Sequence, residues 1–203
     1  MKPLIIVGQG VNAQQLADKI ELFRGKDVLF GSLNRFYYFE EEVLNTIGRS
    51  FDYIWYSSPT RYATDKPYLD KAIARGVQIM SSYKGAEEFK FPDNTIRSEF
   101  GAGYSSIFAM LCALIDNGYD NIYLAGFDGV AKNESNIYFW QETFTDQFRT
   151  RVFSIARDTK AMNEMFWWYV EYALNRTNED VSIKTVTTSA LTCFDTCSIE
   201  DIK

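Results

Sequence analysis

The sequence predicts an α/β protein built on a doubly wound, mostly parallel sheet of about six strands. Three observations predict this class. Short runs rich in apolar residues, typical of strands buried on both faces, alternate with longer segments of helical periodicity. Glycine or serine turns follow several of these runs. The length of 203 residues fits one domain spanning residues 1–203.

The expected strands are too short for helices and are bounded by turn residues. The first reads Leu-Ile-Ile-Val and ends at a Gly-Gln-Gly turn. The fifth reads Asn-Ile-Tyr-Leu-Ala and ends at Gly-Phe-Asp-Gly. The six expected strands are residues 4–7, 27–30, 53–56, 77–80, 121–125 and 181–186.

Helical segments separate these strands, which favours right-handed crossovers between parallel neighbours. Asn12 is expected to cap the first helix, and Pro67 is expected in the first turn of the third. A strongly apolar helix at 103–117 precedes Gly118, a typical C-terminal stop. The remaining expectations are helices at 36–47 and 158–174, an irregular excursion or lid at 82–98, and an active-site loop and helix at 130–160.

The composition excludes several kinds of chemistry. The chain has no histidine, which rules out Ser-His-Asp and Cys-His nucleophiles, His-ligated zinc and imidazole proton shuttles. It carries 21 Lys and Arg against 27 Asp and Glu, a formal net charge of −6. A general nucleic-acid binder usually has a basic surface, so this balance disfavours that class.

Cysteine usage and the N-terminus indicate a cytoplasmic protein. The three cysteines, Cys112, Cys193 and Cys197, make neither a disulfide framework nor a metal-ligand set. The N-terminal apolar run is too short for a signal peptide, and no stretch approaches the length of a membrane span. We therefore expect no membrane span and no bound metal.

Ligands of parallel α/β sheets bind beyond the carboxyl ends of the strands, where four loops are expected to meet. The first contains Gly8 and Gly10, with Ala13 completing a Gly-x-Gly-x-x-Ala pattern. Glycines here allow backbone N–H groups to approach a phosphate, or they serve only the geometry of the turn. No acidic residue ends the second expected strand, which argues against ordinary NAD binding.

Polar residues follow two further strands. Ser32, Asn34 and Arg35 are suited to a base edge, ribose hydroxyls and a phosphate, or they form a helix cap with a surface arginine. Asp128 is suited to binding a metal, orienting a sugar or acting as a base, or it belongs to a simple Asp-Gly turn.

The start of the apolar helix offers a second anion site. Gly103 brings free backbone amides there, and Ser105 and Ser106 add hydroxyls, or these residues serve close packing against the sheet. Tyr138 and Arg157 follow the sheet core, where an aromatic ring can stack on a sugar and an arginine can stabilise a leaving phosphate.

Three segments together resemble the bacterial lipooligosaccharide sialyltransferases and the related motility accessory-factor glycosyltransferases. They are the Gly-x-Gly opening, residues 34–40 and residues 118–128. The resemblance implies a single Rossmann-like domain that binds a nucleotide-activated sugar without a metal. It carries donor contacts over to Gly8, Gln9, Gly10, Asn34, Arg35, Ser57 and Gly103, with Ser105 as the replacement for a family hydroxyl.

The chain departs from that resemblance at the catalytic base. The family histidine falls in the region that here reads Phe-Ser-Ile-Ala-Arg at 153–157, which contains none. Tyr138 is the approximate counterpart of the tyrosines that assist the departing phosphate. We therefore expect a non-histidine base, with Asp128 in that role and Arg35, Tyr138 or Arg157 neutralising the phosphate.

The resulting hypothesis is a glycosyltransferase-like enzyme that moves a sugar from a nucleotide-sugar donor to an acceptor hydroxyl. The acceptor is either a glycan or a hydroxymethylated base in DNA. The nucleotide sugar is a substrate, and no cofactor is expected. The first alternative is a non-catalytic nucleotide or nucleotide-sugar binding protein. The second is an interaction protein that uses its aromatic surface to form a homo-oligomer.

Overall fold

The computed structural model describes residues 2–99, 106–128 and 181–202. Within these ranges the chain forms one eight-stranded sheet in the order β5-β4-β3-β2-β1-β6-β7-β8, and every neighbouring pair is parallel. The predicted α/β class with a doubly wound, Rossmann-like sheet is confirmed, with two strands more than the expected six. The strands are β1 Leu4–Val7, β2 Leu29–Leu33, β3 Tyr53–Trp55, β4 Gln78–Ser82, β5 Ile96–Ser98, β6 Asn121–Ala125, β7 Ser182–Thr185 and β8 Asp195–Thr196.

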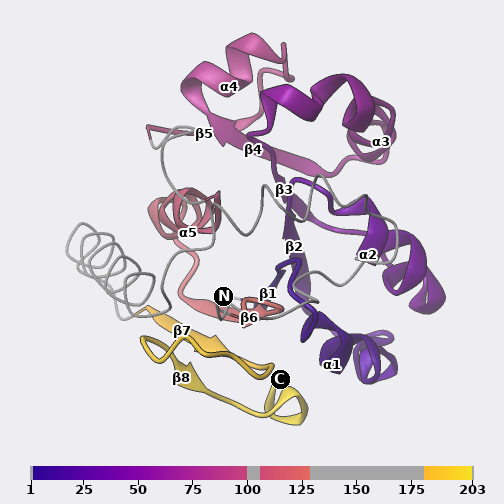
Figure 1. Cartoon of the computed structure of the whole chain (residues 1–203), viewed down its shortest axis with the longest axis vertical. Coiled ribbons are helices and arrows are strands. Elements are labelled where there is room, and N and C mark those ends of the chain that lie inside the picture. The colour runs from indigo at the N-terminus through magenta and orange to yellow at the C-terminus, as the bar shows by residue number, and fades with distance from the viewer. Residues whose placement is uncertain (1, 100–105, 129–180, 203) are drawn as a thin grey trace, which may run out of the picture.

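Helices cover both faces of this sheet. In Figure 1, α1, α2 and α3 lie on one side, and α5 lies on the other. The described α-helices are α1 Ala13–Ala17, α2 Tyr37–Glu42, α3 Tyr62–Ala74, α4 Tyr83–Glu88 and α5 Ser106–Asp116. Short 3-10 turns are Ile20–Phe23, Leu44–Ile47, Pro59–Arg61 and Ile199–Asp201.

The apolar runs become strands because both of their faces are buried. Ile5 and Val7 of β1 pack in the cluster under α1, α2 and α3, whereas Leu4 and Ile6 pack in the cluster under α5. Side chains alternate between the faces of a strand, so a continuous apolar run fills both clusters. Helix α5 is buried over nine consecutive residues, which matches its apolar sequence.

The strand order reverses beside β1. The chain adds β2, β3, β4 and β5 successively to one side of β1, and then crosses to place β6 on its other side. The connections after β1 and β6 therefore lead to strands on opposite sides of this pair, β2 and β7. This is the topological switch point, the usual place for a ligand in such sheets.

Residues 82–98 differ from the expected irregular excursion. They contain α4 and β5, and β5 pairs with β4 from Met80–Ile96 to Ser82–Ser98. The side chain of Ser82 accepts a hydrogen bond from the Gly85 N–H at 3.0 Å, which caps α4. This segment is a short parallel βαβ unit that extends the sheet by one strand.

Three further local expectations were wrong. Helix α3 begins at Tyr62, so Pro67 lies inside the helix rather than in its first turn. The side chain of Asn12 does not cap α1 and donates instead to the Thr188 carbonyl at 2.9 Å. The second strand continues through Gly31 and Ser32, which had been expected in the turn that follows it.

The described part of the chain contains no helix that is both long enough and apolar enough to cross a membrane.

Candidate functional site

The loops after β1 and β6 are closed against each other at the switch point. The N–H of Gly8 donates to the Ala125 carbonyl at 2.7 Å, and the N–H of Gly10 donates to the Gly126 carbonyl at 2.8 Å. One turn further on, the N–H of Asn12 donates to Oδ2 of Asp128 at 2.9 Å. Alternate amides of the glycine turn thus have partners within the protein.

This close approach explains both glycines without any ligand. A Cβ on Gly8 would lie 2.5 Å from the Gly126 carbonyl oxygen. A Cβ on Gly10 would lie 2.4 Å from the Asp128 carboxyl carbon and 2.5 and 2.7 Å from its oxygens. Real Cβ atoms do not approach this closely, so only glycine fits while the Asp128 carboxylate rests on this turn.

The segment after β7 holds the Asp128 loop in place, and we call residues 187–190 the β7 strap. The hydroxyl of Thr187 accepts the Gly126 N–H at 2.9 Å, and the hydroxyl of Ser189 donates to the Phe127 carbonyl at 2.6 Å. The N–H of Ala190 donates to the backbone carbonyl of Asp128 at 2.7 Å. None of these residues was among the predicted site residues, although a Thr-Thr-Ser run at the end of a strand was a signal for them.

A second polar cluster lies on the other side of β1. Asn34 has a φ of 44°, and its Oδ1 accepts the Ser57 N–H at 3.0 Å. The Oγ atoms of Ser57 and Ser106 are 3.0 Å apart, and Nδ2 of Asn34 lies 3.4 Å from Ser106 Oγ. This Asn34 cluster joins the ends of β2 and β3 to the start of α5, and all three side chains keep partial access to solvent. All three members were among the candidate residues, whereas Ser105 lies outside the described residues.

Gln9 and Ser32 connect these two regions. The amide of Gln9 donates to the Leu33 carbonyl at 2.5 Å, which fixes the β1 loop to the end of β2. Ser32 is buried and donates to the Val7 carbonyl at 3.0 Å, so its hydroxyl serves the sheet. Arg35 follows Asn34 and is only 4% exposed. The geometry therefore brings Gln9, Asn34, Ser57 and Asp128 to one edge, and Arg35, the next residue after Asn34, is buried.

A buried carboxylate supports the β3 loop. Asp65 is fully buried, and it accepts hydrogen bonds from the Tyr37 hydroxyl at 3.0 Å and the Tyr56 hydroxyl at 3.1 Å. Burial, together with the charge of Asp65, raises the pKa of each tyrosine far above its usual value of about 10. The Tyr56 hydroxyl also lies 3.0 Å from the Ser58 carbonyl, so this network positions the loop that carries Ser57.

Four predicted site residues lie outside the described ranges, namely Gly103, Ser105, Tyr138 and Arg157. Within the described ranges, no group of three or more His, Cys, Asp or Glu side chains is arranged to hold a metal ion.

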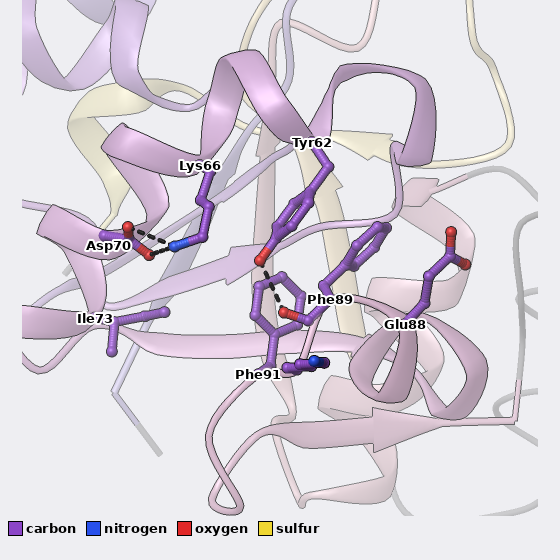
Figure 2. A pocket seen from close by; sticks show the side chains of 8 residues that line it. Tyr62, Lys66, Asp70, Ile73, Glu88, Phe89 and Phe91 are labelled. Carbon is purple, nitrogen blue, oxygen red and sulfur yellow. Dashed lines mark hydrogen bonds and ion pairs between the residues drawn. The ribbon is translucent and has the colours of Figure 1, made fainter.

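A hollow of about 360 Å³ lies between α3 and the end of α4. Figure 2 shows the Tyr62 ring against Phe89, with its hydroxyl donating to the Phe89 carbonyl at 2.8 Å. Lys66 and Asp70 on its rim form an ion pair at 2.7 Å. The rings of Tyr62 and Phe89 pack on each other, and the charges of Lys66 and Asp70 pair with each other.

The carboxyl edge offers the more useful chemistry. Amide and hydroxyl groups of the Asn34 cluster both donate and accept hydrogen bonds, which suits a nucleotide. The carboxylate of Asp128 accepts hydrogen bonds only, and it can take a proton from a hydroxyl. These two kinds of group lie on opposite sides of the β1 loop.

No protein-family model, curated protein or solved structure matches this chain. The resemblance to the sialyltransferases and motility accessory-factor glycosyltransferases therefore stays a prediction that rests on the quoted segments.

Proposed function

We propose that the protein is a glycosyltransferase-like enzyme that takes a sugar from a nucleotide-sugar donor at the carboxyl edge of its sheet. One observation carries this proposal. The Asn34 cluster and the Asp128 carboxylate lie on two sides of the same β1 loop, at the switch point of a parallel sheet. Nucleotide ligands favour this position in folds of the same architecture.

In the proposed reaction, the Asn34 cluster holds the nucleotide and Asp128 serves the acceptor. The acceptor oxygen bonds to the anomeric carbon of the sugar as the bond from that carbon to the phosphate oxygen breaks. Asp128 takes the proton of the acceptor hydroxyl, and the nucleotide leaves with the electron pair of the broken bond. A carboxylate suits this role where the sugar becomes oxocarbenium-like, because the hydroxyl then loses its proton late in the reaction.

The acceptor in this proposal is a hydroxyl group on a glycan or on a hydroxymethylated base in DNA. The net charge of −6 favours the glycan, since a DNA acceptor brings phosphates that the chain would repel. Arg35 is the described cation nearest in sequence to the nucleotide cluster, and it is proposed to balance the phosphate charge.

The second candidate is a non-catalytic nucleotide or nucleotide-sugar binding protein. The complete absence of histidine favours it, because the resembling enzymes use a histidine as the base. The two candidates differ only in turnover, so a single assay separates them.

That assay incubates the protein with a panel of nucleotide sugars and follows nucleotide release with and without acceptors. The matched variants are Asp128→Asn and Asp70→Asn, the latter an exposed aspartate paired with Lys66 on α3. Loss of a general base lowers turnover on the order of a hundredfold or more, so Asp128→Asn should lose that activity and keep its donor affinity. Asp70→Asn should leave both unchanged.

Each other outcome has a definite meaning. Tight donor binding with no turnover on any acceptor favours the binding protein. Unchanged turnover in Asp128→Asn removes Asp128 from the proposal. If no nucleotide or nucleotide sugar binds, both candidates are wrong.

A further inference from the structure

The hydrogen bonds at the switch point restrict which group of a ligand can lie there. In many parallel α/β proteins a phosphate lies on the turn after the first strand, where backbone N–H groups point at it. Here the N–H groups of Gly8, Gly10 and Asn12 donate instead to Ala125, to Gly126 and to the Asp128 carboxylate. A phosphate that used these three N–H groups would have to break these bonds.

The negative charge of Asp128 also disfavours a phosphate at the turn after β1. Its carboxylate lies directly over Gly10, in van der Waals contact with the backbone of the turn. A phosphate on the same turn would lie close to this carboxylate. The two negative charges would repel each other, and more strongly where the protein excludes water. The β7 strap binds the backbone of this loop through Thr187, Ser189 and Ala190, which keeps the Asp128 backbone beside the turn.

We infer that the β1–β6 end of the site is an acceptor subsite, which takes an uncharged, hydroxyl-bearing group and excludes the donor phosphate. This inference rests on the proposed function, and it assigns the two ends of that site. Oδ2 of Asp128 holds the Asn12 N–H and Oδ1 is buried, so an incoming hydroxyl must open the contacts that cover Oδ1 while the Asn12 N–H stays in place. The phosphate then lies on the side of the Asn34 cluster.

The division reverses the assignment that the Gly-x-Gly pattern predicts. That pattern places the nucleotide on Gly8 and Gly10. In the structure the same glycines make room for the Asp128 carboxylate and the Gly126 carbonyl.

Amide resonances of the full-length, isotope-labelled protein test this assignment, because the Asn12 N–H donates directly to Asp128. The probes are inorganic pyrophosphate, lactose as a glycan acceptor, and 5-hydroxymethyl-2′-deoxycytidine as a modified-base acceptor. We expect one acceptor probe to shift the Gly10 and Asn12 amides, and the responding probe identifies the acceptor class. Pyrophosphate should leave both amides unchanged.

The variant Asp128→Asn keeps the shape of the side chain and an oxygen for the Asn12 N–H. This variant should lower the affinity of the protein for the acceptor probe about tenfold, as expected for loss of one hydrogen bond to a charged group. Unchanged resonances elsewhere would show that the variant is folded. An equal affinity in this variant would overturn the inference.

The inference and the proposed function fail in different ways. Pyrophosphate shifts at Gly10 and Asn12 in the unmodified protein would overturn the acceptor subsite, and so would the absence of any response to both acceptor probes. Either result leaves nucleotide-sugar binding standing if the donor panel still shifts Asn34 and Ser57. An acceptor response with no donor binding anywhere would support the subsite and overturn the transferase.

Discussion

At the scale of single residues, Gly10 shows how a local packing contact shapes the site. The Asp128 carboxylate occupies the volume that any side chain at position 10 would need. The residue is therefore glycine because of what lies opposite it 118 positions later in the chain. No spacing rule within the first loop contains that information.

We predict that Gly10→Ala displaces the Asp128 carboxylate and lowers the free energy of unfolding by about 1–3 kcal/mol, the usual range for overpacking. Chemical denaturation measures this change, and the donor and acceptor assays measure its effect on the site.

The matched control is Gly25→Ala. Gly25 has a φ of +72° and open space around its missing Cβ, so only the backbone preference changes there. We expect the free energy of unfolding to fall by about 1 kcal/mol and ligand binding to stay unchanged. If Gly10→Ala behaved like this control, Asp128 would not be held over the turn.

The tyrosines around Asp65 give a prediction in pH. Their pKa values are raised in the folded protein, so Tyr37 and Tyr56 stay protonated there while the same groups ionise at about pH 10 in the unfolded chain. The unfolded state then binds fewer protons than the folded state, and stability falls as pH rises above about 10. Below that pH the contribution is fully present.

The free energy of unfolding between pH 9 and 11 measures this slope, roughly the range that brackets an ordinary tyrosine. The double variant Tyr37→Phe and Tyr56→Phe should have a smaller slope of unfolding free energy against pH. A slope that is identical in the double variant would show that these two phenols ionise normally in the fold.

At the scale of elements, the β7 strap connects the end of β7 to the loop after β6. The Gly126 N–H is buried, and its hydroxyl partner Thr187 is 61 positions away. The strap therefore exists only once β6 and β7 have paired, from Asn121–Ser182 to Leu124–Thr185.

We predict that Thr187→Val destabilises the protein by about 1–3 kcal/mol, because the buried Gly126 N–H loses its acceptor. The same variant should reduce turnover through a misplaced Asp128, with a larger effect on kcat than on the donor KM. Thermal unfolding and steady-state kinetics measure the two effects.

Thr188→Val tests whether the hydroxyl or the segment matters. Thr188 is exposed, and its hydroxyl accepts a hydrogen bond from the amide of the half-buried Gln15 at 2.9 Å. We expect its free energy of unfolding to change by no more than about 0.5 kcal/mol, with kcat and KM unchanged. Equal losses in the two variants would contradict a specific role for Thr187.

The elements also show what sequence could and could not predict. Strand β1 was predicted correctly because Leu-Ile-Ile-Val fills both faces of a sheet. The end of β2 was misjudged because Gly31 and Ser32 resemble a turn. Inside the sheet, Gly31 gives space to the Met110 side chain, and the Ser32 hydroxyl bonds to the Val7 carbonyl.

Short edge strands escaped prediction for a different reason. Strand β5 has three residues and β8 has two, and neither carries an apolar run. Their strand conformation depends on the neighbours that pair with them, β4 and β7. A pattern read within one segment cannot contain that pairing.

At the scale of the whole molecule, the sequence predicted which loops meet but not how they meet. Asn34, Ser57 and Asp128 all follow strands, so their arrival at the carboxyl edge was predictable from the parallel topology. The closure of the β1 loop onto the β6 loop was not, because it depends on hydrogen bonds between distant backbone groups. That closure divides one predicted nucleotide site into two ends.

The measurement that tests the central claim most directly is amide mapping of nucleotide-sugar binding on both edges of the sheet. We predict that a donor shifts the amides of Asn34, Ser57 and Ser106 at the carboxyl edge and leaves those of Asp52 and Gln78 at the opposite edge unchanged. Shifts confined to Asp52 and Gln78, or no shift with any donor, would contradict the claim.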